Sequence, residues 1–326
     1  MGAIGPSTQH DLERNHRLIS AGTFGCAIAA ALIYTAGVLM LKRSTIWNPG
    51  PWRTTLLCNF VAALVFAPML LWGDPVQDYS MLWQPFLVGV FFVIGQTFVV
   101  LAVTQGDVSV ATPILGLKIL FIAGLLLVFV GQIPSVWIWP ASVLAIIAIA
   151  CLSYQGGNGL TRPAADTTRF WGGRIGLTAA LSLVAALAYA IFDSMIQVWA
   201  PAFSPATFLP LTMFFSAGIS LMMIPMLEGR YTSIPPTAWP WLIGGSILTG
   251  LQSVFLTYAI GTWGQAASAN VVYSSRGLWS VIAVATVGGF FSKEEFAAPR
   301  SVKAMRLVGA ALITVAILLL MIPTRS

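Results

Sequence analysis

Two basic residues lie in the middle of long apolar segments of this sequence. Lys118 is the only charged residue of ILGLKILFIAGLLLVFV, the stretch from 114 to 130, and Arg276 lies in a second apolar segment closer to the end of the chain. Asp193 is the only acidic residue well inside such a segment. Ammonium and guanidinium groups form strong hydrogen bonds to carboxylates and phosphates. The three residues therefore indicate either an anion-binding site or a buried ion pair.

The composition indicates what must position these side chains. Hydrophobic residues make up 58% of the 326 residues and charged residues 8%, whereas soluble domains have about 25% charged residues. This excludes a water-soluble globule. A membrane-spanning helix needs about 20 apolar residues, and barrel strands instead alternate over about 10 residues. We therefore predict an all-α integral membrane protein with ten transmembrane helices, at 19–41, 54–72, 83–103, 108–130, 135–153, 175–199, 204–226, 238–260, 265–291 and 304–323.

The chain also repeats itself. AALIY starts at position 30 and AALAY at position 185, and GDVSVATPILGLK from 106 lies over GQAASANVVYSSR from 264. The offsets are 155 and 158 residues, and the second alignment pairs Lys118 with Arg276. Because five helices are an odd number, two such units enter the membrane from opposite sides. We predict a polar tail at 1–17, followed by two inverted five-helix repeats at 18–153 and 174–326. The segment 154–173 is the predicted linker between the repeats.

These features resemble the drug/metabolite transporter superfamily, in particular its EamA-like ten-helix members. The resemblance rests on the two repeats, the short loops, and a G-x-x-x-x-A-x-x-x-x-x-x-basic element in spans four and nine. It implies alternating access around a central cavity, with bundles from the two repeats rocking against each other. Sugar-phosphate and nucleotide-sugar translocators of this superfamily bind anions with basic residues on these two spans, where Lys118 and Arg276 lie. This sequence differs from them in having Gly277 beside Arg276 instead of another basic residue.

The depth of the two cations leaves several interpretations open. Lys118 follows Asp107 by eleven residues, which is roughly 16 Å along a helix and half of a ~30 Å hydrocarbon layer. A lysine or arginine there costs about 2.5 to 3.5 kcal/mol, so both should face protein or water. They can bind a substrate anion, one can pair with Asp193, or a side chain can reach the interface along the lipid. Asp193 cannot neutralise both cations.

Asp193 has two interpretations of its own. It lies about six residues, roughly 9 Å, before the predicted end of its span, which places it toward the mouth. It can be a static partner of a basic residue, or it can couple transport to a proton by releasing that residue when protonated.

Helical spacing and the repeat extend the candidate site. Tyr273 shares a face with Arg276, and Asn270 borders that face. Gln96 and Gln252 occupy comparable depths of spans three and eight, and the AALxY motif contributes one tyrosine to each repeat. Aromatic packing or glutamine bridges between helices are the alternative roles. We predict substrate binding by Lys118, Arg276, Tyr273, Asn270, Gln96, Gln252, Tyr34 and Tyr189, with Asp193 as the coupling or ion-pair residue.

The residue inventory argues against other chemistry. His10 and His16 are the only histidines and both lie in the polar tail, which leaves no histidine for a metal site or a catalytic triad inside the bundle. The three cysteines lack metal-ligand spacing. Short, scattered basic loops do not suit nucleic acid, and no P-loop is present. We predict no catalytic residue, no metal, no cofactor and no enzymatic activity.

The expected function is a secondary active transporter of a small anionic or zwitterionic metabolite. An anion channel, a non-transporting membrane scaffold and, less readily, a membrane-embedded enzyme are the alternatives. The expected partners are the lipid bilayer and a small-molecule substrate, without nucleic acid and with the oligomeric state open. Three basic residues lie on the side of the termini and eleven on the other, so the positive-inside rule predicts both termini outside a bacterial inner (plasma) membrane.

Overall fold

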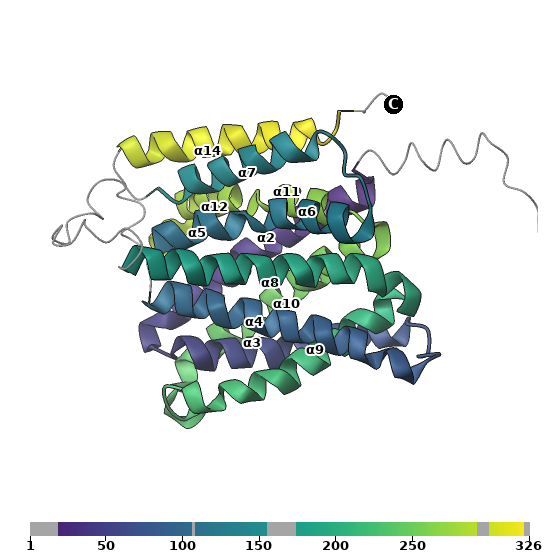
Figure 1. Ribbon diagram of the computed structural model, residues 1–326. Helices are drawn as coiled ribbons and strands as arrows, with labels where there is room; N and C mark the ends of the chain where they lie inside the picture. The colour runs from purple at the N-terminus through teal and green to yellow at the C-terminus, as the bar shows by residue number, and fades with distance from the viewer. Residues whose placement is uncertain (1–18, 106–107, 155–173, 292–299, 323–326) are drawn as a thin grey trace, which may run out of the picture.

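The protein is described here from a computed structural model, which describes residues 19–105, 108–154, 174–291 and 300–322 (Figure 1). The described residues form α-helices and short 3-10 helices, without a strand among them. This confirms the predicted all-helical fold. The α-helices are α2 (Ala21–Ser44), α3 (Pro51–Phe66), α4 (Trp83–Gln105), α5 (Val108–Gly116), α6 (Lys118–Val130), α7 (Ile138–Leu152), α8 (Arg174–Phe203), α9 (Pro205–Ser220), α10 (Trp239–Trp263), α11 (Ala266–Tyr273), α12 (Arg276–Phe291) and α14 (Arg300–Leu319).

Short 3-10 segments extend or connect several of these helices. They are η1 (Thr45–Trp47), η2 (Ala67–Leu71), η3 (Tyr79–Leu82), η5 (Leu221–Met226), η6 (Tyr231–Ser233) and η7 (Pro236–Ala238). The predicted tail 1–17 lies outside the described residues, as does the predicted linker apart from its first residue, Tyr154.

Seven helical segments of the described chain are long and apolar enough to cross a membrane. They are Ala21–Trp47, Pro51–Leu71, Tyr79–Gln105, Val110–Val130, Gly176–Phe203, Pro205–Met226 and Pro236–Trp263. Each overlaps one of the predicted spans. Two shorter apolar helices, Ile138–Leu152 and Ala304–Leu319, overlap two more. These helices suggest a multi-pass membrane protein, whereas the count of ten spans and the inverted repeat stay predictions.

The helices run side by side across the molecule in Figure 1, and the chain crosses between two ends. At one end α2 begins, and residues 131–137 and 264–265 join helices there. We call this the N-terminal end. At the other end α7 stops at Leu152 and residues 227–235 join helices. We call this the linker end.

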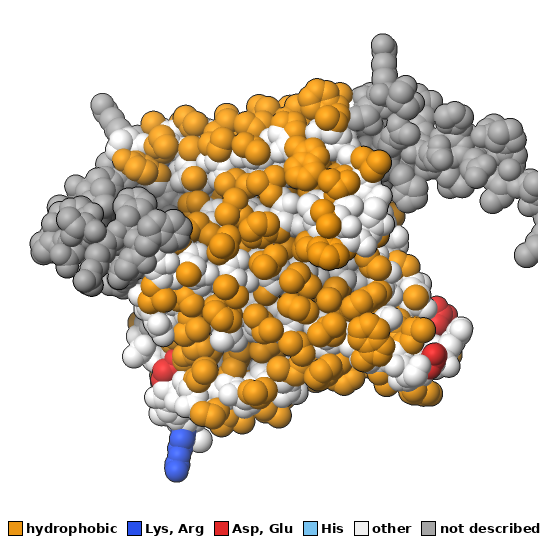
Figure 2. Space-filling model, in the orientation of Figure 1, with side chains coloured by type: hydrophobic (Ala, Val, Ile, Leu, Met, Phe, Trp, Pro, Cys, Tyr) orange, Lys and Arg blue, Asp and Glu red, His pale blue; other side chains and the backbone are white. Residues whose placement is uncertain are grey.

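The outer surface is apolar between these two ends. Figure 2 shows hydrophobic side chains across the middle of the visible face, with the visible charged side chains near the ends. Leu64, Leu71 and Leu307 are at least 70% exposed. A large exposed apolar surface of this kind is expected where a protein contacts lipid.

Glycines let the two most closely packed helices approach each other. A Cβ added at Gly37 of α2 would lie 3.1 Å from side-chain atoms of Leu248 and Thr249 of α10. One added at Gly245 of α10 would lie 2.7 Å from Leu41 of α2. Small residues at such interfaces allow backbone contact where lipid supplies no hydrophobic driving force. The α2–α10 pair therefore fixes the position of Tyr34, which lies one turn from this contact.

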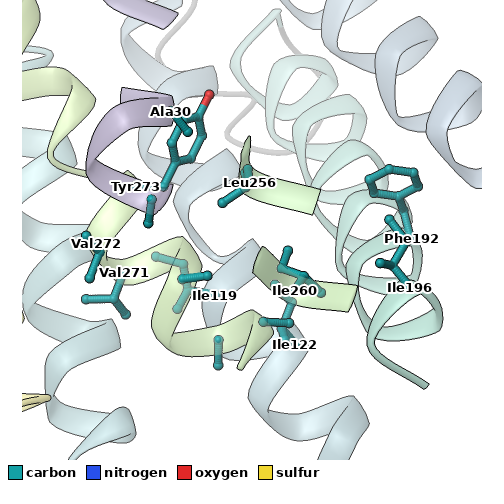
Figure 3. Close-up of a cluster of buried hydrophobic side chains, with 14 of the residues drawn as sticks. Ala30, Ile119, Ile122, Phe192, Ile196, Leu256, Ile260, Val271, Val272 and Tyr273 are labelled. Carbon is teal, nitrogen blue, oxygen red and sulfur yellow. The ribbon is translucent and has the colours of Figure 1, made fainter. Parts of the chain in front are cut away.

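The core consists of small and branched side chains from several helices. Ala30 of α2, Ile119 and Ile122 of α6, Ile260 of α10 and Val271 of α11 are at most 3% exposed, and Figure 3 shows this cluster. Burying one such branched side chain contributes about 1.5 to 3 kcal/mol relative to leaving it exposed. This core surrounds the points at which two of the helical segments are interrupted.

Two of the predicted spans are interrupted within their length, although Val110–Val130 still counts as one candidate span. Segment 108–130 forms α5 and α6, which are separated by Leu117, and 265–291 forms α11 and α12, which are separated by a turn at 274–275. At both places a backbone N–H bonds to the carbonyl three residues earlier: Leu117 to Ile114 at 3.0 Å and Ser275 to Val272 at 3.0 Å. Lys118 and Arg276 are the first residues of the helices that follow.

Candidate functional site

Lys118 forms a buried ion pair with Asp193. Its Nζ lies 2.7 Å from Oδ2 of Asp193. The Asp193 side chain is 1% exposed and the Lys118 side chain 19%. The amide Nδ2 of Asn270 donates to the same Oδ2 at 2.6 Å and to the carbonyl of Ala266 at 2.9 Å. Helices α6, α8 and α11 therefore meet at one carboxylate, which accepts two strong hydrogen bonds.

Aromatic rings pack beside this ion pair. Tyr189 lies one turn before Asp193 on α8, and Lys118 Nζ lies 5.5 Å from the centroid of its ring. Phe92 of α4 contacts Tyr189 and Phe192 with centroid distances of 6.1 and 5.2 Å. A cation at this distance from a ring face is attracted by the ring quadrupole. The ammonium therefore has both a carboxylate and a ring as partners.

Arg276 lies between two tyrosines. Its guanidinium carbon is 4.9 Å from the ring centroid of Tyr34 and 4.6 Å from that of Tyr273. The two rings contact each other edge to face, with centroids 5.8 Å apart. In the described part of the chain, the one ion pair at these helices is that of Lys118 and Asp193, and no carboxylate pairs with Arg276. Two aromatic rings therefore take the place of a counter-ion.

Helix α11 links the two clusters. Asn270 and Tyr273 lie three residues apart on α11, so one helix contributes to both clusters. Seven of the nine predicted residues therefore lie in these two clusters. They are the two cations and the five residues that contact them or their partners: Asp193, Asn270, Tyr189, Tyr34 and Tyr273.

Gln252 is buried and Gln96 is half-buried, and neither side chain has a hydrogen bond to either cation in the described residues. Gln252 donates from Nε2 to Ser253 at 2.7 Å. The side-chain carbonyl oxygens of both glutamines are buried and have no protein partner among the described residues. An unsatisfied buried acceptor costs about 1 to 3 kcal/mol. Both oxygens are suited to accept from a ligand or from water.

The interpretation of Asp193 as a residue near the mouth is corrected. Helix α8 continues to Phe203, whereas its predicted span ends at 199. Asp193 thus lies ten residues from the helix end, and its carboxylate meets Lys118 in the interior. The apolar periodicity ended early because Pro201 interrupts the pattern without ending the helix.

A cavity of about 290 Å³ reaches Arg276 from the linker end. Arg306 of α14 also lines it, as do Leu152 and Ser153 at the end of α7. Sequence reasoning counted Arg306 among the basic residues that orient the chain and did not place it in the site. Arg306 lies six residues after Arg300, the first residue of α14. This position inside the helix is the signal that could have placed Arg306 in the site.

Side-chain amides join helices at the N-terminal end, and sequence reasoning missed these residues too. Gln197 of α8 donates from Nε2 to Oε1 of Gln132 at 2.6 Å and accepts from the backbone N–H of Ala266 at 2.8 Å. Oε1 of Gln265 accepts from the backbone N–H of Ser20 at 2.9 Å. The cavity beside these residues measures about 70 Å³, so little space is left at this end.

No family model matches the chain, and no curated protein matches it. A solved structure described only as "Crystal structure of protein" is similar to it, with a TM-score of 0.70 and 14% sequence identity. The similarity covers 91% of this chain and 95% of that chain. At this identity the likeness shows a shared fold, and the resemblance to the drug/metabolite transporter superfamily stays a prediction.

Proposed function

We propose that this chain is a secondary active transporter of a small anionic or zwitterionic metabolite, with ten spans in two inverted repeats like those of the drug/metabolite transporter superfamily. The observation that carries the proposal is the unequal state of the two cations. Lys118 has a carboxylate partner 2.7 Å away, whereas Arg276 has two tyrosine rings and, among the described residues, no carboxylate. A substrate anion would supply the missing counter-charge.

The arrangement of the two ends supports alternating access. Hydrogen bonds of Gln197 and Gln265 close the N-terminal end around a cavity of about 70 Å³, while a cavity of about 290 Å³ reaches Arg276 from the linker end. A carrier must close one side of its site while the other is open. An anion channel would instead need a path open at both ends in its conducting state.

The Lys118–Asp193 pair is suited to coupling. It lies next to the site and joins α6 to α8, so its separation would let these helices move apart. Protonation of Asp193 or the approach of a substrate carboxylate would weaken the pair. We assign no enzymatic step to the chain, and we propose a bacterial inner (plasma) membrane location with both termini outside.

The experiment is counterflow in proteoliposomes. Purified full-length protein is reconstituted with a panel of labelled acetate, succinate, glycerol 3-phosphate, glutamate and alanine, and uptake is measured with and without the same unlabelled solute inside. We expect trans loading to accelerate uptake of at least one anionic or zwitterionic solute, and Arg276→Ala to abolish it.

Arg230→Ala is the matched control, because it removes an exposed arginine from a loop at the same end of the bundle. Uptake that is not accelerated by trans loading would indicate a channel. Uptake by Arg276→Ala at the wild-type rate would remove Arg276 from the site and contradict the proposal.

A further inference from the structure

The cavity at the linker end is lined by a second arginine that the proposed function does not use. Arg306 of α14 lines the cavity of about 290 Å³ together with Arg276 of α12. The side chain of Arg306 is half-buried, and its Nε is buried without a hydrogen-bond partner in the described part of the chain. A buried donor without a partner favours a ligand that supplies an acceptor.

The remaining walls are hydroxyl-bearing and apolar. The cavity is also lined by Ser153, Ser274 and Ser280, and the described residues around it include no acidic side chain. Gly277 lets α7 pack closely, since a Cβ there would lie 2.8 Å from Leu152. Hydroxyl groups and arginines are common ligands of anionic groups. The wall chemistry therefore fits negative charge.

Two arginines that line one cavity give it a positive charge, which favours an anionic ligand. Both are charged at every physiological pH, because arginine is not deprotonated in proteins. One negative charge would leave one of the two unbalanced, whereas two negative charges would balance both. The volume is near the lower limit of about 300 Å³ for small-molecule sites, so the ligand must be small.

We propose that this cavity binds a small molecule with two negative charges, and that Arg306 is a second anion-binding residue beside Arg276. The inference rests on the proposed function and narrows its substrate class from any anion or zwitterion to a dianion. The planar guanidinium fork suits a carboxylate or a phosphate equally, so a dicarboxylate and a phosphate monoester both fit.

The test uses full-length protein in nanodiscs of phosphatidylcholine, which lacks net charge. Affinities are measured by isothermal titration calorimetry for succinate, glycerol 3-phosphate and the monoanion butyrate. We expect both dianions to bind at least about tenfold more tightly than butyrate, and Arg306→Gln to remove this preference while the affinity for butyrate is unchanged. Affinity for glycerol 3-phosphate should rise from pH 5 to 7, as its phosphate loses its second proton near pH 6.

Two further variants separate a local effect from a general one. Arg230→Gln removes an arginine from an exposed loop position at the same end and should bind succinate as wild type does. Arg306→Lys keeps the charge without the planar fork and should bind succinate with an intermediate affinity. This variant replaces Arg306→Gln in the test if Arg306→Gln does not fold. Equal succinate affinity in wild type and Arg306→Gln would overturn the inference.

The outcomes distinguish the inference from the function on which it rests. Counterflow that persists while Arg306→Gln keeps the wild-type preference would refute the dianion site and leave the transporter intact. Binding that depends on Arg306 without any counterflow would support the site and refute the transporter. If phosphatidylglycerol occupied the cavity and neither dianion bound, the cavity would be a lipid site and the inference would be wrong.

Discussion

Lys118 and Arg276 occupy corresponding places in their helices but have different partners. Each is the first residue after a helix interruption, at α6 and at α12. Lys118 is neutralised by Asp193 and held by Asn270 through that carboxylate, whereas Arg276 lies between Tyr34 and Tyr273. Both cations thus follow a helix interruption, but only Lys118 has a carboxylate as its partner among the described residues. A cation that is already paired serves structure or coupling, and an unpaired one is free to bind.

The side-chain chemistry explains why the partners are not interchangeable. An ammonium is a compact, strongly hydrated charge, so its burial requires a carboxylate. A guanidinium is planar and weakly hydrated, and it stacks on aromatic rings. Rings attract a cation without cancelling its charge. Arg276 can therefore remain half-buried and still attract an anion, as the proposed transport site requires.

The largest effect should follow from removing the counter-charge of Lys118. Asp193→Ala leaves a buried ammonium without its partner, which we expect to destabilise the protein by about 3 to 5 kcal/mol. Arg276→Met leaves no carboxylate stranded and should cost clearly less. The measurement is the free energy of unfolding in mixed micelles. The double variant Lys118→Met, Asp193→Leu should recover most of the loss, because it removes both charges together. Equal losses for the two single variants would show that the cations do not differ.

Much of this comparison was visible in the sequence, which offered Asp193 as an ion-pair partner and Tyr273 as a neighbour of Arg276, but it did not show which of the two cations pairs with Asp193. The long apolar segments predicted the helices, and the alignment of Lys118 with Arg276 directed attention to the right turns. The ion pair joins residues 75 positions apart, so it depends on how α6 packs against α8. The interruption at Leu117 left no signal in that residue, because leucine is a good helix former. Arg306 was counted among the basic residues that orient the chain, because it lies near the start of the predicted span 304–323.

A second effect should come from replacing Arg276 by lysine. The charge is kept, but the ammonium cannot stack on both rings and lacks the fork that binds a carboxylate or phosphate through two hydrogen bonds. We expect the affinity for the transported anion to fall about tenfold or more, which corresponds to at least about 1.4 kcal/mol. The reverse change, Lys118→Arg, should leave this affinity within about threefold because Lys118 is already paired. Uptake rates at a series of substrate concentrations measure both, and a larger loss for Lys118→Arg would reverse the assignment of the two cations.

The tyrosine rings can be tested separately from their hydroxyl groups. Tyr34→Phe keeps the ring beside Arg276 and should change anion affinity little, whereas Tyr34→Leu removes one cation–π contact worth about 0.5 to 2 kcal/mol. We expect about a 3- to 30-fold loss for the leucine variant in the same uptake assay. Leu32 of α2, which is 44% exposed, provides a control as Leu32→Ala. If the phenylalanine variant lost as much as the leucine variant, a hydroxyl contact rather than the ring would hold the guanidinium.

The smallest effect concerns the closed end, which is tied to the Lys118 cluster rather than to Arg276. Gln197 follows Asp193 by one turn on α8, and Ala266, which donates to Gln197, precedes Asn270 by one turn on α11. The same two helices are thus joined twice, once at the ion pair and once at the closure.

Gln197→Leu removes two hydrogen bonds, each worth about 0.5 to 1.5 kcal/mol, and should shift the protein toward opening at the N-terminal end. A cysteine introduced at Ser135, beside this closure, in a background without native cysteines should then react several-fold faster with a membrane-impermeant maleimide. Anion affinity at Arg276 should stay within about twofold when measured in detergent, because the cavity at the linker end does not include Gln197. An unchanged labelling rate would mean that the amide contacts do not hold this end closed. The comparison of the two cations would then rest on their partners alone.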